Sequence, residues 1–133
     1  MSLGGRVPQT PFSQFKHQEG ESTMITVAHV KSKAPAGSIS VHVGRPRILG
    51  NPFPMSRAAT AVREDEIRKE VIAKYRVWLW ARIKEQGEEY KELVRIKDLH
   101  KSGKHVRLTC FCHPKACHAD VIKRAVEWMA AQE

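Results

Sequence analysis

The stretch "HVRLTCFCHPKACHADVI" at His105–Ile122 has the pattern of a strand, a short loop and the start of a helix. Its first eight residues alternate, which predicts a strand with Cys110 on the buried face. A tight loop containing Pro114 follows, and the last helix is expected to begin near Cys117 or His118 and to reach about Ala131. Such a strand–loop–helix unit is typical of α/β domains with a parallel sheet.

Four further elements are expected upstream of this unit. "MITVAHV" at 24–30 is rich in β-formers and "SISVHVGR" at 38–45 alternates, so both are predicted strands, and we expect them to be neighbours. A long amphipathic helix is predicted over Arg57–Gln86, capped by Ser56, with Gly87 at its end, and a shorter one over Glu88–His100. The predicted fold is a small three-layer Rossmann-like α/β domain, with a mostly parallel sheet and helices on its faces.

The chain of 133 residues suits one domain. Residues 1–23 are rich in Gly, Pro, Ser and Gln and show no sustained period, which predicts a flexible tail with Phe12 and Phe15 as possible docking points. A single α/β domain is expected over residues 24–133.

Composition narrows the functional classes. No apolar run approaches the roughly 18 residues of a spanning helix, so we expect no membrane partner and a cytoplasmic location. The three cysteines crowd into residues 110–117, which favours reduced thiols over a disulfide framework. The net charge of +9 favours phosphate-bearing or polyanionic partners, nucleic acid included.

A rigid loop follows the strand at 38–45. Three prolines and a glycine in Pro46–Pro54 exclude regular structure, so apolar members of the loop can anchor it while Arg45, Asn51 and Phe53 face a ligand. The alternative is that Asn51 caps a turn with its own side chain.

The thiol-rich loop has three interpretations. Cys110, Cys112, Cys117 and His118 offer four zinc ligands, but two cysteines on a strand lie about 7 Å apart, unlike the C-x2-C turns of zinc sites. Cys117 at a helix N-terminus is alternatively a reactive thiol, because the helix dipole favours its thiolate. In the third interpretation the same helix end is part of a pocket for an anion.

The pocket interpretation joins the two loops. If the strands at 38–45 and 105–112 are parallel, both loops emerge at one edge of the sheet, where α/β domains bind their ligands. The predicted ligand-binding residues are Arg45, Gly50, Asn51, Phe53, Cys112 and Lys115. The predicted catalytic residues are Cys117, His118 and Asp120. Structural alternatives remain for two of them, a helix-dipole partner for Asp120 and a capping or buried histidine for His118.

The two loops together resemble the paired signatures of an uncharacterised bacterial and phage family. "VHVGRPRILGNPF" at Val41–Phe53 and "LTCFCHPKACHADVI" at Leu108–Ile122 carry the resemblance, and "KYRVWLW" at Lys74–Trp80 fits its middle element. It covers about residues 24–130 and implies a compact three-layer α/β domain, similar to Rossmann-like modules that cleave or sense nucleoside derivatives. The motif positions are Arg45, Gly50, Asn51, Pro52, Phe53, Cys110, Cys112, Pro114, Cys117, His118 and Asp120, and the chain departs from the pattern at Ala119, where a glycine often sits.

The sequence therefore predicts a protein that binds a nucleotide, nucleoside or related phosphate-bearing ligand. A hydrolase or transferase acting on a nucleoside or nucleotide fits this interpretation, with no cofactor and no metal. One alternative is a basic nucleic-acid-binding accessory protein of the phage type. Another is a zinc-stabilised interaction module.

Overall fold

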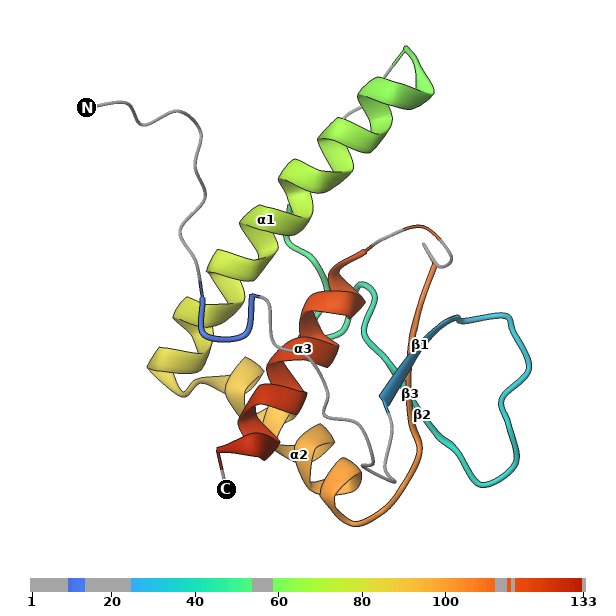
Figure 1. Ribbon diagram of the computed structural model, residues 1–133, viewed down its shortest axis with the longest axis vertical. Coiled ribbons are helices and arrows are strands. Elements are labelled where there is room, and N and C mark those ends of the chain that lie inside the picture. The colour runs from blue at the N-terminus through green and yellow to red at the C-terminus, as the bar shows by residue number, and fades with distance from the viewer. Residues whose placement is uncertain (1–9, 14–24, 54–58, 112–114, 116, 133) are drawn as a thin grey trace.

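The computed structural model describes residues 10–13, 25–53, 59–111, 115 and 117–132 (Figure 1). In chain order the elements are β1 (Ile25–His29), β2 (Ile39–His42), α1 (Ala61–Glu85), α2 (Glu88–Lys101), β3 (Val106–Cys110) and α3 (His118–Ala131). None of the helices in these ranges is both long enough and apolar enough to cross a membrane.

The three strands form one parallel sheet in the order β1-β3-β2. The prediction that the first two strands are neighbours is wrong, because β3 lies between them. β3 takes the centre because all five of its residues are buried, and a central strand is covered on both sides. The carboxyl ends of β2 and β3 lie at the same edge of the sheet, since the two strands are parallel.

The elements are arranged in three layers. α2 and α3 pack against the sheet, and α1 packs against both of these helices. All three helices lie together on one side of the strands (Figure 1). The predicted class, a small three-layer α/β domain with a parallel sheet, is confirmed, but the helices cover one face of the sheet and not both.

The long helix begins later than predicted. α1 starts at Ala61, because the Thr60 hydroxyl accepts a hydrogen bond from the backbone N–H of Arg63 at 3.1 Å and caps the helix. The predicted cap, Ser56, lies outside the described residues. Gln86 ends the helix with a left-handed backbone (φ 56°), and Gly87 is the N-cap of α2 instead of the end of α1.

The two faces of the sheet differ in chemistry. On the core face, Val106, Leu108 and Cys110 of β3 are buried in one cluster with apolar side chains of the helices. The alternating residues form the other face, which we call the open face. Its members are Thr26, Ala28, Ser40, His42, His105, Arg107, Thr109 and Phe111.

A short N-terminal segment, residues 10–13, packs against the helices. Phe12 is fully buried, and its ring lies 6.2 Å from the rings of both Trp80 and Trp128. Arg124 of α3 donates a hydrogen bond to the Ser13 carbonyl at 2.7 Å. These residues belong to the segment expected to be a tail, and Phe15, the second expected docking point, lies outside the described residues.

Candidate functional site

A cavity of about 190 Å³ lies at the carboxyl ends of β2 and β3. Three segments contribute to it: the loop after β2, the β3 end with the start of α3, and one side of α1. Its described lining residues are Gly44, Arg45, Asn51, Phe53, Arg68, Val71, Ile72, Cys110, Phe111, Cys117 and His118. The two loops singled out by sequence thus meet at one cavity.

The loop after β2 is held in shape by its own polar groups. The Arg45 guanidinium donates to the carbonyls of Asn51 (2.7 Å) and Phe53 (3.2 Å). The Asn51 side-chain oxygen accepts from the Phe53 N–H at 2.8 Å, which is the turn-capping contact given above as the alternative. Arg45 is exposed and keeps further N–H donors beyond these two bonds.

A hydrogen bond also joins the same loop to α1. Leu49 is buried in the core, and its carbonyl accepts a hydrogen bond from the buried Tyr75 hydroxyl at 2.7 Å. The Gly50 N–H donates to the Arg47 carbonyl at 2.8 Å, and a Cβ at position 50 would lie 2.9 Å from that carbonyl oxygen. Gly50 therefore shapes the turn, and it is not among the residues that line the cavity.

Cys117 is the N-cap of α3. Its Sγ accepts a hydrogen bond from the Ala119 N–H at 3.4 Å and lies 3.2 Å from Sγ of Cys110, and both side chains are buried. Cys110 belongs to the core, as predicted. The position of Cys117 at the helix N-terminus is the one on which the reactive-thiol interpretation depends.

His118 forms part of the cavity wall and is buried. Its Nε2 lies 2.6 Å from the Val43 carbonyl oxygen, and its ring packs edge-on against Tyr75 at 5.1 Å. A carbonyl only accepts, so Nε2 carries the proton and Nδ1 carries the lone pair. Burial lowers the pKa of His118 from its usual value, although the Val43 carbonyl opposes the shift, and the imidazole is neutral near pH 7.

Two further predicted residues lie outside the cavity lining. The Asp120 carboxylate accepts a hydrogen bond from the Cys117 N–H at 3.2 Å and completes a capping box with the N-cap side chain. The Lys115 ammonium lies 3.5 Å from the Glu64 carboxylate at the start of α1. Cys112, the remaining predicted ligand-binding residue, lies outside the described residues.

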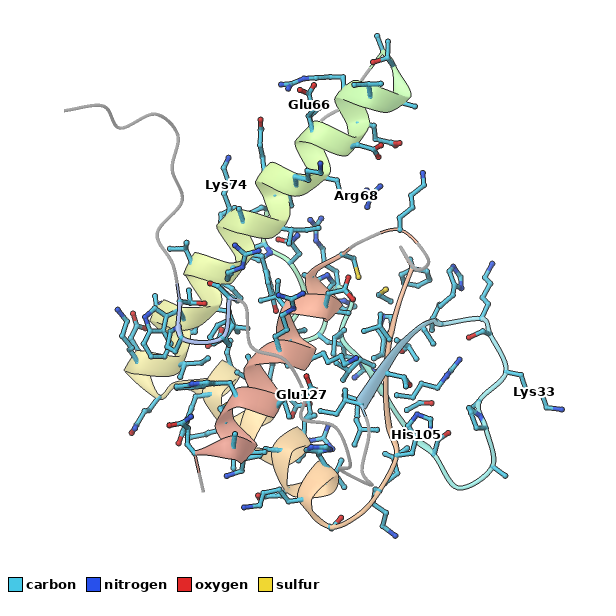
Figure 2. The ribbon with its side chains drawn as sticks, in the orientation of Figure 1. Lys33, Glu66, Arg68, Lys74, His105 and Glu127 are labelled. Atoms are coloured by element: carbon cyan, nitrogen blue, oxygen red, sulfur yellow. The ribbon has the colours of Figure 1, made fainter. Side chains whose placement is uncertain are left out.

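One wall of the cavity was missed by the sequence prediction. Arg68, Val71 and Ile72 line it from α1, at the i, i+3 and i+4 spacing of one helix face. Arg68 extends from α1 on the side facing the sheet, whereas Lys74 points to the other side (Figure 2). An arginine within an apolar i, i+3, i+4 set is the available signal in the sequence, but the arginine borders the apolar stripe of the helix, where basic residues usually face solvent.

The described lining therefore contains two guanidinium groups and no carboxylate. Among the described residues, no group of three or more His, Cys, Asp or Glu side chains is placed to hold a metal ion. Cys112 and His113 lie outside those residues, so the zinc interpretation stays a prediction, to be checked by elemental analysis of the purified protein.

Comparison with known proteins identifies the family. No curated protein and no solved structure matches the chain. The model of one family, described as "Domain of unknown function (DUF4326)", matches residues 26–128, a range that includes every described wall of the cavity. The resemblance to an uncharacterised family is confirmed at this level: the chain belongs to the DUF4326 family.

Proposed function

We propose that the cavity binds a nucleotide, nucleoside or related phosphate-bearing ligand. The observation that carries the proposal is the pair of guanidinium groups, Arg45 and Arg68, on a wall that is otherwise mostly apolar and includes no described carboxylate. Arginine pairs with phosphate through parallel N–H bonds, and apolar walls favour a base or a sugar face. The position at the carboxyl ends of parallel strands is where ligands bind in open α/β sheets.

The cavity volume limits what part of the ligand is enclosed. At about 190 Å³ it is smaller than the roughly 300–1,000 Å³ of sites that enclose a whole drug-sized ligand. We therefore expect it to enclose one portion, a phosphate with its sugar or a base. The remainder of the ligand would lie along the edge of the sheet beside Phe53 and Phe111.

Hydrolysis or group transfer is the reaction class within this proposal. His118 Nδ1 would accept a proton, because the ring is neutral and its other nitrogen is bonded to Val43. Cys117 Sγ, on the cavity wall, would be the nucleophile. Asp120 would act by holding the Cys117 backbone at the helix start.

Calorimetry with a panel of nucleosides and nucleoside mono-, di- and triphosphates tests binding. We expect Arg68→Gln to weaken phosphate-bearing ligands about tenfold or more and to leave phosphate-free nucleosides nearly unchanged. The matched control is Lys69→Gln, an exposed cation on α1 that does not line the cavity. Absence of binding across the panel, or equal losses in the two variants, would refute the proposal.

Chromatography of the same mixtures tests the reaction. Products formed by the wild-type protein should disappear in Cys117→Ser and His118→Gln. A wild-type protein that binds nucleotides but leaves them intact would retain the binding proposal and exclude the catalytic one.

A further inference from the structure

Charge is segregated between the sheet and the helices. Residues 22–63 and 99–119 contain no Asp or Glu, and these ranges include all three strands and the loops that directly precede and follow them. Every described carboxylate lies on a helix, as Glu66 and Glu127 do, whereas Lys33 and His105 belong to the sheet side (Figure 2). The described cations of the sheet side are Lys31, Lys33, Arg45, Arg47, Lys104, Arg107 and Lys115. The sheet side is therefore complementary to a polyanion.

An exposed aromatic ring stands at the carboxyl end of the open face. Phe111 is 62% exposed. Its ring meets the ring of His42 edge-on at 5.4 Å and that of His29 at 6.2 Å. His42 is held in turn by the Thr109 hydroxyl at 3.1 Å. Phe111 is thus a solvent-facing ring whose orientation is fixed by two neighbours, the arrangement on which a nucleic-acid base stacks.

Two lysines of the sheet side, Lys31 and Lys33, lie on the loop between β1 and β2. The buried Arg107 guanidinium donates to the Ser40 hydroxyl (3.0 Å) and to the carbonyls of His29 (3.2 Å) and Ser32 (2.5 Å). These bonds fix the loop that carries Lys31 and Lys33 against the edge of the sheet. Both lysines are exposed, and neither has a carboxylate partner among the described residues. Their positions are therefore set before a polyanion binds.

We propose that the open face binds single-stranded nucleic acid, with a base on Phe111 and phosphates on Lys31, Lys33 and Lys104. Charge alone would also suit an acidic peptide, but a fixed exposed ring favours a partner with planar bases. A duplex keeps its bases stacked inside and offers none to the ring. Phe111 also lines the cavity, but Lys31, Lys33 and Lys104 do not. The surface therefore extends beyond the small-molecule site proposed above.

Fluorescence anisotropy with labelled (dT)15 and (rU)15 across a salt series tests the proposal. For three phosphate contacts the slope of log K against log salt should be about −2. Replacing both Lys31 and Lys33 with Gln should make the slope shallower by about 1.4. The matched control replaces Lys69 and Lys74, two exposed lysines of α1, and should leave the slope unchanged.

Stacking has its own pair of variants. Phe111→Ala should weaken binding by about 5- to 150-fold, the usual effect of removing one base-stacking ring. Val62→Ala changes an apolar side chain of α1 that is 73% exposed and should have no effect. Far-ultraviolet circular dichroism confirms that both variants are folded.

Three results would overturn the inference. The first is no binding of either oligonucleotide at low salt. The second is an equal loss in Phe111→Ala and Val62→Ala. The third is displacement of the oligonucleotide by polyglutamate with the same affinity in wild type and Phe111→Ala, which would assign the face to acidic peptides. Val71→Phe places a larger side chain in the cavity. It should abolish nucleotide binding and leave the affinity for the oligonucleotides unchanged. The two proposals can therefore fail separately.

Discussion

Replacing Tyr75 with Phe removes one oxygen atom at the junction between α1 and the loop after β2. The Tyr75 hydroxyl is buried and donates to the Leu49 carbonyl at 2.7 Å, and burial raises its pKa well above the usual value, so it remains a donor at any practical pH. The variant keeps the ring and its packing but leaves a buried carbonyl without this donor. Such a loss costs about 1–2 kcal/mol of the free energy of unfolding. For a domain of this size that lowers Tm by roughly 4–10 °C.

Urea unfolding followed by tryptophan fluorescence measures the change. The midpoint should fall while the denaturant slope stays constant, because the surface exposed on unfolding is the same. Hydrogen exchange should accelerate at the Gly50 amide, which bonds to Arg47 within the tethered loop. Tyr90→Phe is the control, since Tyr90 is half-buried and its hydroxyl forms no hydrogen bond among the described residues. A Tyr75→Phe protein as stable as Tyr90→Phe would show that the loop does not depend on this bond.

Three further changes test the site. Burial lowers the pKa of His118 below its unfolded value of 6.5, so the unfolded chain binds a proton first as pH falls. The free energy of unfolding should therefore decrease below about pH 6.5, by up to about 1.4 kcal/mol per pH unit. In urea unfolding measured across pH, His118→Gln should flatten that part of the curve. Gly50→Ala places a methyl group 2.9 Å from a backbone carbonyl and should lower Tm by several degrees. Gly87→Ala, with no atom nearer than 3.6 Å, should lower Tm less, by only the preference of the N-cap position for glycine over alanine; equal losses would contradict this steric argument. Asp120→Ala breaks the capping box and should cost about 1 kcal/mol, and restoration by Asp120→Asn would support capping over a purely electrostatic effect.

Hydrophobic alternation predicted the parts of the fold that depend on burial. It assigned Cys110 to the core, which is confirmed. The helical period of the last segment predicted a helix from about Cys117 or His118 to about Ala131, and α3 spans His118–Ala131. It did not predict that β3 separates β1 from β2, because alternation identifies the buried face of a strand and not its neighbour. Strand order depends on packing between residues far apart in the sequence, and a local pattern carries no information on it.

The roles of the short polar side chains at the site were harder to predict from the sequence. Asn51 and Asp120 bond to backbone N–H groups close to them in sequence, and the same residue types in the same loops also suit a ligand. The sequence alone therefore does not show whether such a side chain bonds to the backbone or binds a ligand. Arg68 was missed for a different reason. The apolar residues beside it on α1 line the cavity, but in the sequence they have the same spacing as residues that pack in the core.

Phe12, wedged between two indole rings, has a practical consequence for anyone who shortens the chain. A fragment beginning at Met24 would match the family boundaries yet lack a side chain that fills the gap between α1 and α3. Burial of one phenylalanine contributes roughly 1.5–3 kcal/mol, so such a fragment should melt earlier. The tryptophan emission of this fragment should also shift to longer wavelength, because water reaches the two indole rings that Phe12 covers. The fluorescence of the protein therefore reports whether the N-terminal segment is bound between α1 and α3.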